Sequence, residues 1–322
     1  MSERGTARRP GPPRGRTAAA LACLLALLVL AACQPGPVPA VPGRERAGTV
    51  VVASFNFPVS VLLATIYGLA IRHAGIPVRL ELGLGPRELV LPALEKGLVD
   101  VVPEYLGTAL TSFEPHPSVT MSDPAMVRAA LARALAIWGA QVLTPAAAQD
   151  QNGVVVTRAT AARLGLRTVS DLRRAAGRLT IGGSPECRSR PACLPGLGSV
   201  YGLRFARFLP FDTEQQRVTA LKEGVVDAAV LTTTDGNLAA GGLVLLADDR
   251  HLQPVENIAP VVRADDLARY GSRLTGAVNA VSARLTSAEL LFLNWRIEVA
   301  GDSVQAEARA WLQRHGILPR AG

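Results

Sequence analysis

The residues best suited to bind a small molecule stand at the ends of two similar segments. Residues 93–108 read ALEKGLVDVVPEYLGT, and residues 220–235 read ALKEGVVDAAVLTTTD. The polar side chains that close them are Glu104, Tyr105 and Thr108 in the first segment and Thr232, Thr233 and Asp235 in the second. A carboxylate and an aromatic ring attract a cation, whereas hydroxyl groups bind a carboxylate or water. Alternatively, these side chains cap helices, form turns or pair with an arginine.

Both segments share one order of elements. Each reads as the end of a helix, a glycine stop at Gly97 or Gly224, an apolar strand and a polar turn. Two such units predict two similar α/β lobes, although a chance likeness between two helix–strand units is the alternative. Ligands of open α/β sheets bind outside the carboxyl ends of the strands. We therefore expect Tyr105 and Thr232 to face one shared cleft.

Other candidate binding residues follow further predicted strands or linkers. They are Ser54, Asn56 and Phe57 after a strand over 49–53, Gln151 and Asn152 in a polar stretch, and Ser184, Glu186 and Arg190 beside a cysteine loop. The guanidinium of Arg190 has the fork geometry that holds a carboxylate. Most arginines of the chain must nevertheless be solvated, and serine and asparagine also form turns without any ligand.

The rest of the pattern completes an α/β chain with two crossovers. Strands are expected over 49–53 and 77–82, and helices from Pro58 to about Ala74, from Pro86 to Gly97 and from Pro124 to about Trp138, with closing helices over 273–283, 287–299 and 303–315. Pro92 should kink or interrupt the second of these helices. Linkers near 146–152 and 250–258 divide the chain into lobe 1, residues 49–149 plus 256–322, and lobe 2, residues 150–255. Two linkers between lobes are what a hinge requires.

Composition excludes some classes of protein. The chain has 322 residues, of which 49% are hydrophobic and 19% charged, and its formal net charge is +8. This length suggests two domains, and the composition is far from that of disordered chains. The basic residues form no continuous run and are accompanied by few aromatic residues, so we expect no nucleic-acid partner.

The N-terminus has the features of a secretory signal. Arginines up to Arg16 precede an apolar, uncharged run that ends in Leu-Ala-Ala before Cys33. This ending resembles the bacterial lipobox, which implies that residues 1–33 are a lipoprotein signal ending at a lipidated Cys33. An ordinary cleaved signal with an incidental cysteine is the alternative. Residues 34–48 are rich in Pro and Gly and indicate a flexible tether.

The other cysteines indicate an oxidising compartment. Cys23 would leave with the signal, which leaves Cys187 and Cys193 with five residues between them. Outside the cytoplasm such a pair favours a disulfide. A zinc site is the alternative, but no histidine or further cysteine lies nearby in the sequence.

Catalytic patterns find little support. The four histidines are scattered without a metal-ligand spacing, and neither a G-x-S-x-G elbow nor a P-loop occurs. We therefore expect no enzyme, no cofactor and no metal.

Several segments resemble, in order, the substrate-binding proteins of osmoprotectant ABC importers, the glycine betaine/choline/carnitine group. The matching segments are SFNF (54–57), LEKGLVDVVPEYLGTAL (94–110), QDQNGVVVTR (149–158), PECRSRPACLPGLGSVYGL (185–203), ALKEGVVDAAVLTTTD (220–235) and VENIAPVVR (255–263). The resemblance covers residues 49–315. It implies a two-lobed periplasmic-binding-protein type II fold that closes on a small ligand and delivers it to a membrane permease.

The ligands of that family carry a quaternary ammonium held in a cage of tyrosines. Tyr105 and Thr108 match cleft positions of the family. At other positions the chain departs from the pattern, because Asn152 and Thr232 stand where aromatic residues are usual and Ser60 replaces a glutamine. Phe57, Tyr201 and Phe208 are the candidate substitutes. The cage is thus depleted, and the solute is expected to be less cationic or weakly bound.

The sequence therefore predicts an extracytoplasmic, lipid-anchored receptor that binds a betaine-like quaternary amine or related polar osmolyte. Its expected partners are an ABC permease with its ATPase and, through the lipid, a membrane. A sensory or scaffold lipoprotein of the same fold, with another ligand or none, is the alternative. An extracytoplasmic transferase or hydrolase is a third hypothesis, for which the sequence offers no reaction.

Overall fold

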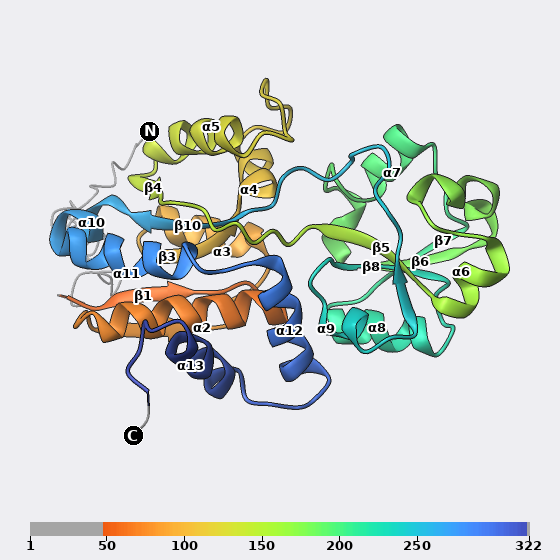
Figure 1. The fold of residues 1–322 in the computed structure, drawn as a ribbon. Coiled ribbons are helices and arrows are strands. Elements are labelled where there is room, and N and C mark those ends of the chain that lie inside the picture. Colours follow the sequence, from red (N-terminus) through yellow and green to blue (C-terminus); the bar gives the residue numbers. More distant parts are fainter. Residues whose placement is uncertain (1–47, 321–322) are drawn as a thin grey trace, which may run out of the picture. The chain divides into compact units, whose positions relative to one another are not determined.

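Residues 48–320 are described by a computed structural model, in which the strands form two separate five-stranded sheets. The first sheet has the order β2-β1-β3-β10-β4, and the second has the order β7-β6-β8-β5-β9 (Figure 1). The first comprises β1 (Val50–Ala53), β2 (Val78–Glu81), β3 (Val101–Tyr105), β4 (Ala140–Val142) and β10 (Ile258–Arg263). The second comprises β5 (Asn152–Thr157), β6 (Thr180–Gly183), β7 (Arg207–Pro210), β8 (Ala228–Thr232) and β9 (Leu243–Leu245).

The two sheets have the same topology. In each sheet three neighbouring strands are parallel, and the fourth runs antiparallel to both of its neighbours. The antiparallel strand is β10 in the first sheet and β5 in the second. Each of them follows a segment in which the chain crosses over from the other sheet. Each sheet with its helices is called a lobe from here on. The predicted α/β class with two lobes is confirmed.

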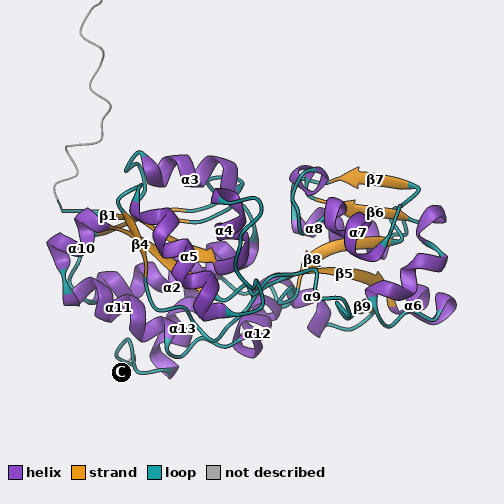
Figure 2. Cartoon of the chain, turned by 90° about the horizontal axis from the view of Figure 1, so that it is seen from above, coloured by secondary structure: helices purple, strands orange, loops and turns teal. Residues whose placement is uncertain are grey.

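Helices cover both sheets (Figure 2). Lobe 1 carries α2 (Pro58–His73), α3 (Arg87–Glu95), α4 (Leu106–Phe113), α5 (Pro124–Ala136), α10 (Ala264–Tyr270), α11 (Ser272–Ser282), α12 (Ser287–Glu298) and α13 (Val304–Arg314). Lobe 2 carries α6 (Arg158–Leu164), α7 (Leu194–Tyr201), α8 (Glu214–Lys222), α9 (Gly236–Ala239) and 3₁₀ turns at Val169–Arg174, Ala176–Arg178 and Pro185–Arg188. None of the helices within 48–320 is long and apolar enough to cross a membrane. The signal, Cys33 and nearly all of the tether lie outside the described residues.

The sequence repeat corresponds to a structural repeat. Asp100 accepts a hydrogen bond from the backbone N–H of Val51 at 2.8 Å and donates its own N–H to the carbonyl of Val51 at 2.8 Å. Asp227 makes the same pair with Thr180, at 2.9 Å in both directions. The Val-Asp element common to the two segments thus fastens each strand to the start of its parallel neighbour.

The interruption expected at Pro92, one of the two alternatives for this helix, does not occur. Helix α3 runs without a break through Pro92. A proline removes one intrahelical hydrogen bond and crowds the preceding turn. Here the loss falls in the second turn of a short helix, whose buried residues Val90, Leu91 and Leu94 hold it against the core of lobe 1. The closing helices lie within about one residue of their predicted bounds, as expected for assignment of helix ends.

The two linkers run antiparallel to each other. Asp150 donates its N–H to the carbonyl of Glu256 at 3.1 Å, and the N–H of Glu256 donates to Oε1 of Gln149 at 3.2 Å. In addition to the two linkers, a contact between α12 and α9 joins the lobes. There Asn294 Nδ2 donates to the carbonyl of Thr234 at 2.7 Å. Gly236 lies against the backbone of α12, since an added Cβ would stand 2.5 Å from the carbonyl carbon of Asn294.

The first prediction concerns this close approach. Gly236→Ala should lower the free energy of unfolding by about 1–3 kcal/mol, because backbone atoms of α12 cannot rotate away from the new methyl group. Urea denaturation followed by circular dichroism measures the change. Gly276→Ala in α11 is the matched control, since a Cβ added there would have nothing within 4 Å. It should be neutral or slightly stabilising, and equal stability of both variants would show that α9 and α12 do not meet this closely.

Candidate functional site

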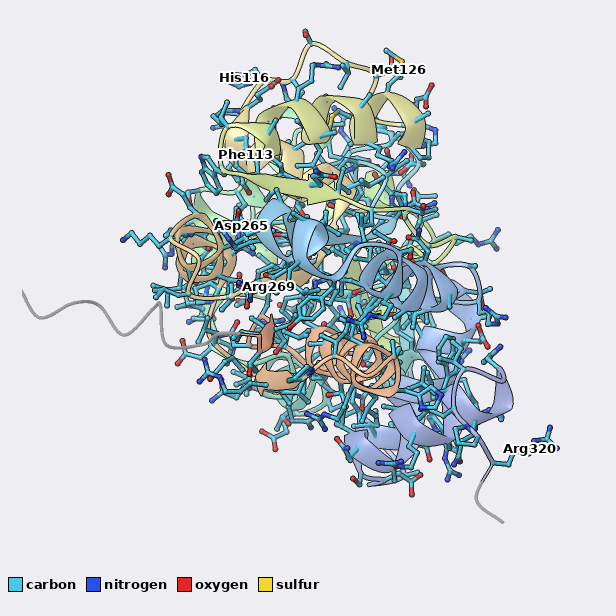
Figure 3. All side chains as sticks on the ribbon, turned by 90° about the vertical axis from the view of Figure 1, so that its left-hand side faces the viewer. Phe113, His116, Met126, Asp265, Arg269 and Arg320 are labelled. Carbon is cyan, nitrogen blue, oxygen red and sulfur yellow. A yellow bond between two sulfur atoms is a disulfide. The ribbon has the colours of Figure 1, made fainter. Side chains whose placement is uncertain are left out.

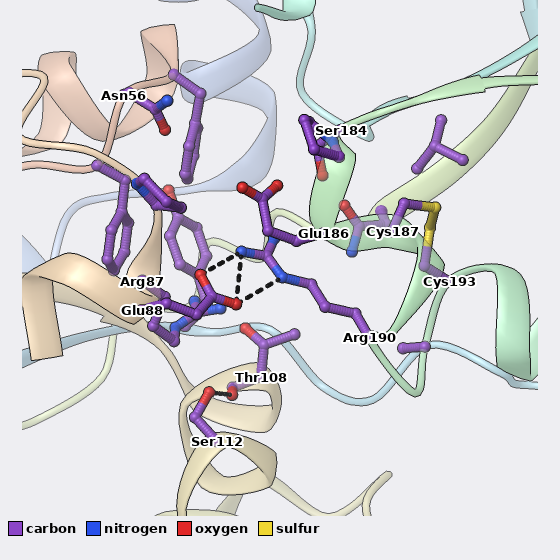
Figure 4. A pocket seen from close by; sticks show the side chains of 18 of the residues that line it. Asn56, Arg87, Glu88, Thr108, Ser112, Ser184, Glu186, Cys187, Arg190 and Cys193 are labelled. Carbon is purple, nitrogen blue, oxygen red and sulfur yellow. Dashed lines mark hydrogen bonds and ion pairs between the residues drawn. A yellow bond between two sulfur atoms is a disulfide. The ribbon is translucent and has the colours of Figure 1, made fainter. Parts of the chain in front are cut away.

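A cavity of about 780 Å³ is lined by side chains from both lobes and from the linkers. It contains four of the predicted residues of lobe 1, namely Asn56, Phe57, Tyr105 and Thr108. It also contains five predicted residues of lobe 2, namely Asn152, Ser184, Glu186, Arg190 and Thr232. Tyr105 and Thr232 therefore share one recess. Figure 4 shows Asn56 and Thr108 on one side and Ser184 and Glu186 on the other.

Five predicted residues lie outside this lining and have structural partners. They are Ser54, Glu104, Gln151, Thr233 and Asp235. Ser54 Oγ, just after β1, accepts the N–H of Gly83 at 2.8 Å and so joins the turns that follow β1 and β2. Thr233 Oγ1 accepts the N–H of Gln151 at 3.0 Å, while Gln151 Nε2 donates to the carbonyl of Pro254 at 2.7 Å. Asp235 caps α9, which is the alternative that the sequence left open.

Glu104 is fully buried behind Arg87. The guanidinium donates from Nε to Oε1 at 3.1 Å and from Nη2 to Oε2 at 3.0 Å. Arg87 lines the cavity and lies over the ring of Phe55, 5.0 Å from its centroid. Glu104 therefore cannot contact a cationic ligand directly, because its carboxylate is neutralised by an arginine that stands between it and the cavity.

Three aromatic rings form a wall of lobe 1. The centroids of Phe55 and Phe57 lie 5.7 Å apart with nearly parallel planes, and Tyr105 lies 5.8 Å from Phe57. Burial, followed by the negative charge of Asp150, raises the pKa of Tyr105 well above its ordinary value. The hydroxyl of Tyr105 is buried and finds no hydrogen-bond partner within residues 48–320. A donor of this kind, in an apolar wall, is available to a ligand.

The other proposed aromatic substitutes do not reach the cavity. Tyr201 is fully buried in the core of lobe 2, where its hydroxyl bonds to Asp248. Phe208 lies under the guanidinium of Arg188, 5.0 Å from its ring centroid. On the wall of lobe 2, Asn152 and Thr232 are cross-strand partners in β5 and β8. The two positions that lack the family's aromatic residues therefore form one polar patch.

The cysteine loop carries Arg190 into the cavity. Cys187 and Cys193 form a disulfide with their Cα atoms 5.2 Å apart. Arg190 Nη2 lies 3.0 Å from Oε2 of Glu88 in α3, so the pair joins the two lobes (Figure 4). The guanidinium of Arg190, which we expected to hold a ligand carboxylate, is thus paired with Glu88 of the opposite lobe.

Buried carboxylates surround the linker side of the cavity. Glu256 accepts the backbone N–H groups of Gly107 and Thr108, both at 3.1 Å, at the first turn of α4. Asp150 accepts from Thr234 Oγ1 at 2.7 Å. Burial raises the pKa of Glu256 to about 8 and that of Asp150 to about 7. These groups are held by neutral donors rather than by ion pairs.

Glu214 and Arg217 complete the lining on lobe 2. Glu214 accepts the N–H of Thr232 at 2.7 Å and lies 4.0 Å from the guanidinium of Arg217. Burial raises the pKa of Glu214 to about 7. Many lining residues were not predicted from the sequence, among them Phe55, Arg87, Glu214, Arg217 and Glu256. The capping box at Thr213 could have drawn attention to Glu214, but nothing in the sequence places Arg87 opposite Glu104.

The described residues hold no cluster of side chains that could bind a metal ion. No group of three or more His, Cys, Asp and Glu side chains that could hold a metal occurs in residues 48–320. His116 lies on an outer loop between α4 and α5, as Figure 3 shows. His315 contacts Glu289 near the end of the described chain. Among the described residues that line the cavity there is no histidine.

The second prediction compares two arginines of the cavity. Arg87→Leu leaves the buried Glu104 without a cation and should destabilise the protein by about 3–5 kcal/mol. Arg190→Leu removes a solvent-exposed pair and should cost less than about 1 kcal/mol. Chemical denaturation of both variants gives the comparison. Equal losses would contradict the difference in burial, and the double variant Arg87→Leu/Glu104→Leu should recover most of the stability.

The third prediction uses the raised pKa of Glu256. The folded protein holds this proton up to about pH 8, whereas the unfolded chain releases it near the ordinary value of 4.5. The folded state therefore binds more protons between these values, and its stability falls as pH rises through this window. Glu256→Gln should remove this contribution. Thermal melts at about pH 5 and about pH 8 should show a smaller loss of Tm in the variant, and parallel slopes would contradict the assignment.

Comparisons with known proteins identify the family. The profile described as the substrate binding domain of ABC-type glycine betaine transport system matches residues 48–314. A glycine-betaine-binding protein of Pseudomonas aeruginosa is 29% identical over 293 residues, which cover 86% of this chain and 91% of the relative. The glycine betaine-binding protein YehZ of Escherichia coli is 27% identical over 286 residues, which cover 84% and 92%.

A solved structure agrees on the fold. The crystal structure of a glycine betaine/carnitine/choline ABC transporter protein superposes with a TM-score of 0.67 at 23% identity, covering 83% of this chain and 99% of that one. The resemblance found in the sequence is confirmed. The chain belongs to the family of substrate-binding domains of ABC-type glycine betaine transport systems.

Proposed function

We propose that this protein is the solute receptor of an ABC importer and binds a small quaternary amine of the betaine or choline type. The observation that supports it most is the cavity, which joins the aromatic wall of Phe55, Phe57 and Tyr105 to buried carboxylates of the linkers and lobe 2. The proposal includes an extracytoplasmic location, a lipid anchor at Cys33, and delivery to a permease with its ATPase. A binding role rather than catalysis agrees with the names of the relatives.

The aromatic wall supplies attraction for a cation without hydrogen bonds. A quaternary ammonium has no N–H, so it interacts with ring faces, and this attraction is worth about 2 kcal/mol when the cation is desolvated. Phe57 and Tyr105 present such faces from the loop before α2 and from the end of β3. The hydroxyl of Tyr105 can in addition bond to an oxygen of the ligand.

Binding can also drive closure. A ligand shifts an equilibrium between open and closed forms only if it contacts the closed form better. Contacts with rings of lobe 1 and with polar groups of lobe 2 meet that condition. The paired linkers at Asp150 and Glu256 give the chain two adjacent places to bend.

The fourth prediction tests the aromatic wall. Tyr105→Ala and Phe57→Ala should each weaken binding of a trimethylammonium ligand by roughly tenfold to thirtyfold, because each removes one ring face. Isothermal titration with choline, glycine betaine and carnitine measures this. Phe292→Ala, at an exposed site of α12 outside the cavity, is the control and should bind like the wild type. Unchanged affinity in both wall variants would place the ligand elsewhere.

A further inference from the structure

Acidic residues outnumber basic ones in the lining of the cavity, whereas the chain as a whole is basic. The chain has a formal net charge of +8. The acidic residues of the lining are Glu88, Asp150, Glu186, Asp212, Glu214 and Glu256, whereas its basic residues are Arg87, Arg190 and Arg217. Six acidic residues thus stand against three basic ones, although burial raises the pKa values of Asp150 and Glu214 to about 7 and that of Glu256 to about 8, so these three bind protons near neutral pH before a ligand binds. When its members are ionised, this surplus of acidic residues favours positive charge in the ligand.

Two of the three guanidinium groups are already occupied. The guanidinium of Arg87 donates hydrogen bonds from Nε and Nη2 to Glu104, and its planar face lies over the ring of Phe55. Arg190 gives its fork to Glu88 at 3.0 and 3.2 Å. A carboxylate of the ligand would have to displace a protein carboxylate from either arginine.

Arg217 is the remaining guanidinium, and acidic groups surround it. Its Nη1 donates to the carbonyl of Phe211 at 3.4 Å, and its Nη2 lies 4.0 Å from Glu214. The negative charges of Glu214, Asp235 and Glu186 also act on it. Its Nε finds no acceptor within the described residues, so Arg217 is the place where a ligand carboxylate would have to bind if one were accepted.

The first turn of α4 offers the other possible anion site. Backbone N–H groups at a helix N-terminus bind anions well. Here those of Gly107 and Thr108 point to the carboxylate of Glu256 at 3.1 Å. Glu256 fills the position that a ligand carboxylate would take, so a ligand carboxylate would have to displace it from these N–H groups.

From this arrangement we propose that the cavity selects by net charge, accepting quaternary amines that carry no carboxylate and discriminating against zwitterionic ones. The inference rests on the proposed function and names the ligand class of that same site. The cation would lie between the aromatic wall and the carboxylates of Glu256, Asp150 and Glu214. Burial raises the pKa values of these three carboxyl groups, and a cation bound beside them would favour their ionised forms.

The test uses three ligands with the same trimethylammonium head. Choline ends in a hydroxyl group, glycine betaine ends in a carboxylate, and the methyl ester of glycine betaine has its skeleton without the charge. Isothermal titration of the full-length protein should give dissociation constants for choline and the ester at least about tenfold lower than for glycine betaine, a difference of roughly 1.4 kcal/mol.

A variant tests the role of Glu256 in this preference. Glu256→Gln removes the competing carboxylate, so glycine betaine should bind more tightly and choline more weakly, and the preference should shrink at least about fivefold. Glu95→Gln, an exposed residue at the end of α3 outside the lining, is the control and should keep the wild-type ratio. Circular dichroism of each variant establishes that it is folded, and the wild-type ratio stands as a test by itself.

The outcomes separate this inference from the proposed function. Tighter binding of glycine betaine than of choline would overturn the charge selectivity and leave a quaternary-amine receptor. Loss of that glycine betaine binding in Arg217→Gln would then locate the carboxylate at Arg217. If none of the three ligands binds at millimolar concentration, the proposed function fails, and the inference fails with it.

Discussion

A carboxylate removed from water must be met by donors or by a cation, and this requirement governs the contacts around the cavity. Glu104 is met by the fork of Arg87. Glu256 and Asp150 are met only by neutral N–H and O–H donors from Gly107, Thr108 and Thr234. The first arrangement pairs opposite charges, whereas the second leaves buried acidic groups with raised pKa values near the aromatic rings of lobe 1. A cation bound at the rings, as proposed, would therefore also favour the ionised form of these acidic groups.

The same residues connect the site to the hinge. Asp150 and Glu256 belong to the two linkers and bond to each other through their backbones. Their side chains reach in different directions, because Asp150 holds Thr234 at the start of α9 and Glu256 holds the first turn of α4. A ligand that alters the charge balance of these two carboxylates therefore acts on the segments that any relative motion of the lobes must bend.

Much of this arrangement could be predicted from the sequence, because it follows from a repeat. The glycines at 97 and 224 and the aspartates at 100 and 227 recur at the same places in both segments, and each aspartate fastens its strand in the same way. Strand ends that recur in this manner must open on corresponding edges of two sheets, which is why Tyr105 and Thr232 share a recess. Pairings between distant side chains could not be predicted. Nothing in the order of residues indicates that Glu88 forms an ion pair with Arg190, or that Tyr201 is buried in the core of lobe 2.

The lack of aromatic residues on lobe 2 has a physical counterpart in what replaces them. Asn152 and Thr232 are cross-strand partners, and the N–H of Thr232 is held by Glu214 at 2.7 Å. A cage with aromatic rings on both lobes would hold a cation by ring faces alone. In this chain the aromatic rings lie on lobe 1, and acidic residues lie on lobe 2 and the linkers. Ring faces attract a cation at short range, while carboxylates in a partly dehydrated cavity act over a longer distance. If the protein binds a cation as proposed, the ionised carboxylates would act on it at longer range than Phe57 and Tyr105 do.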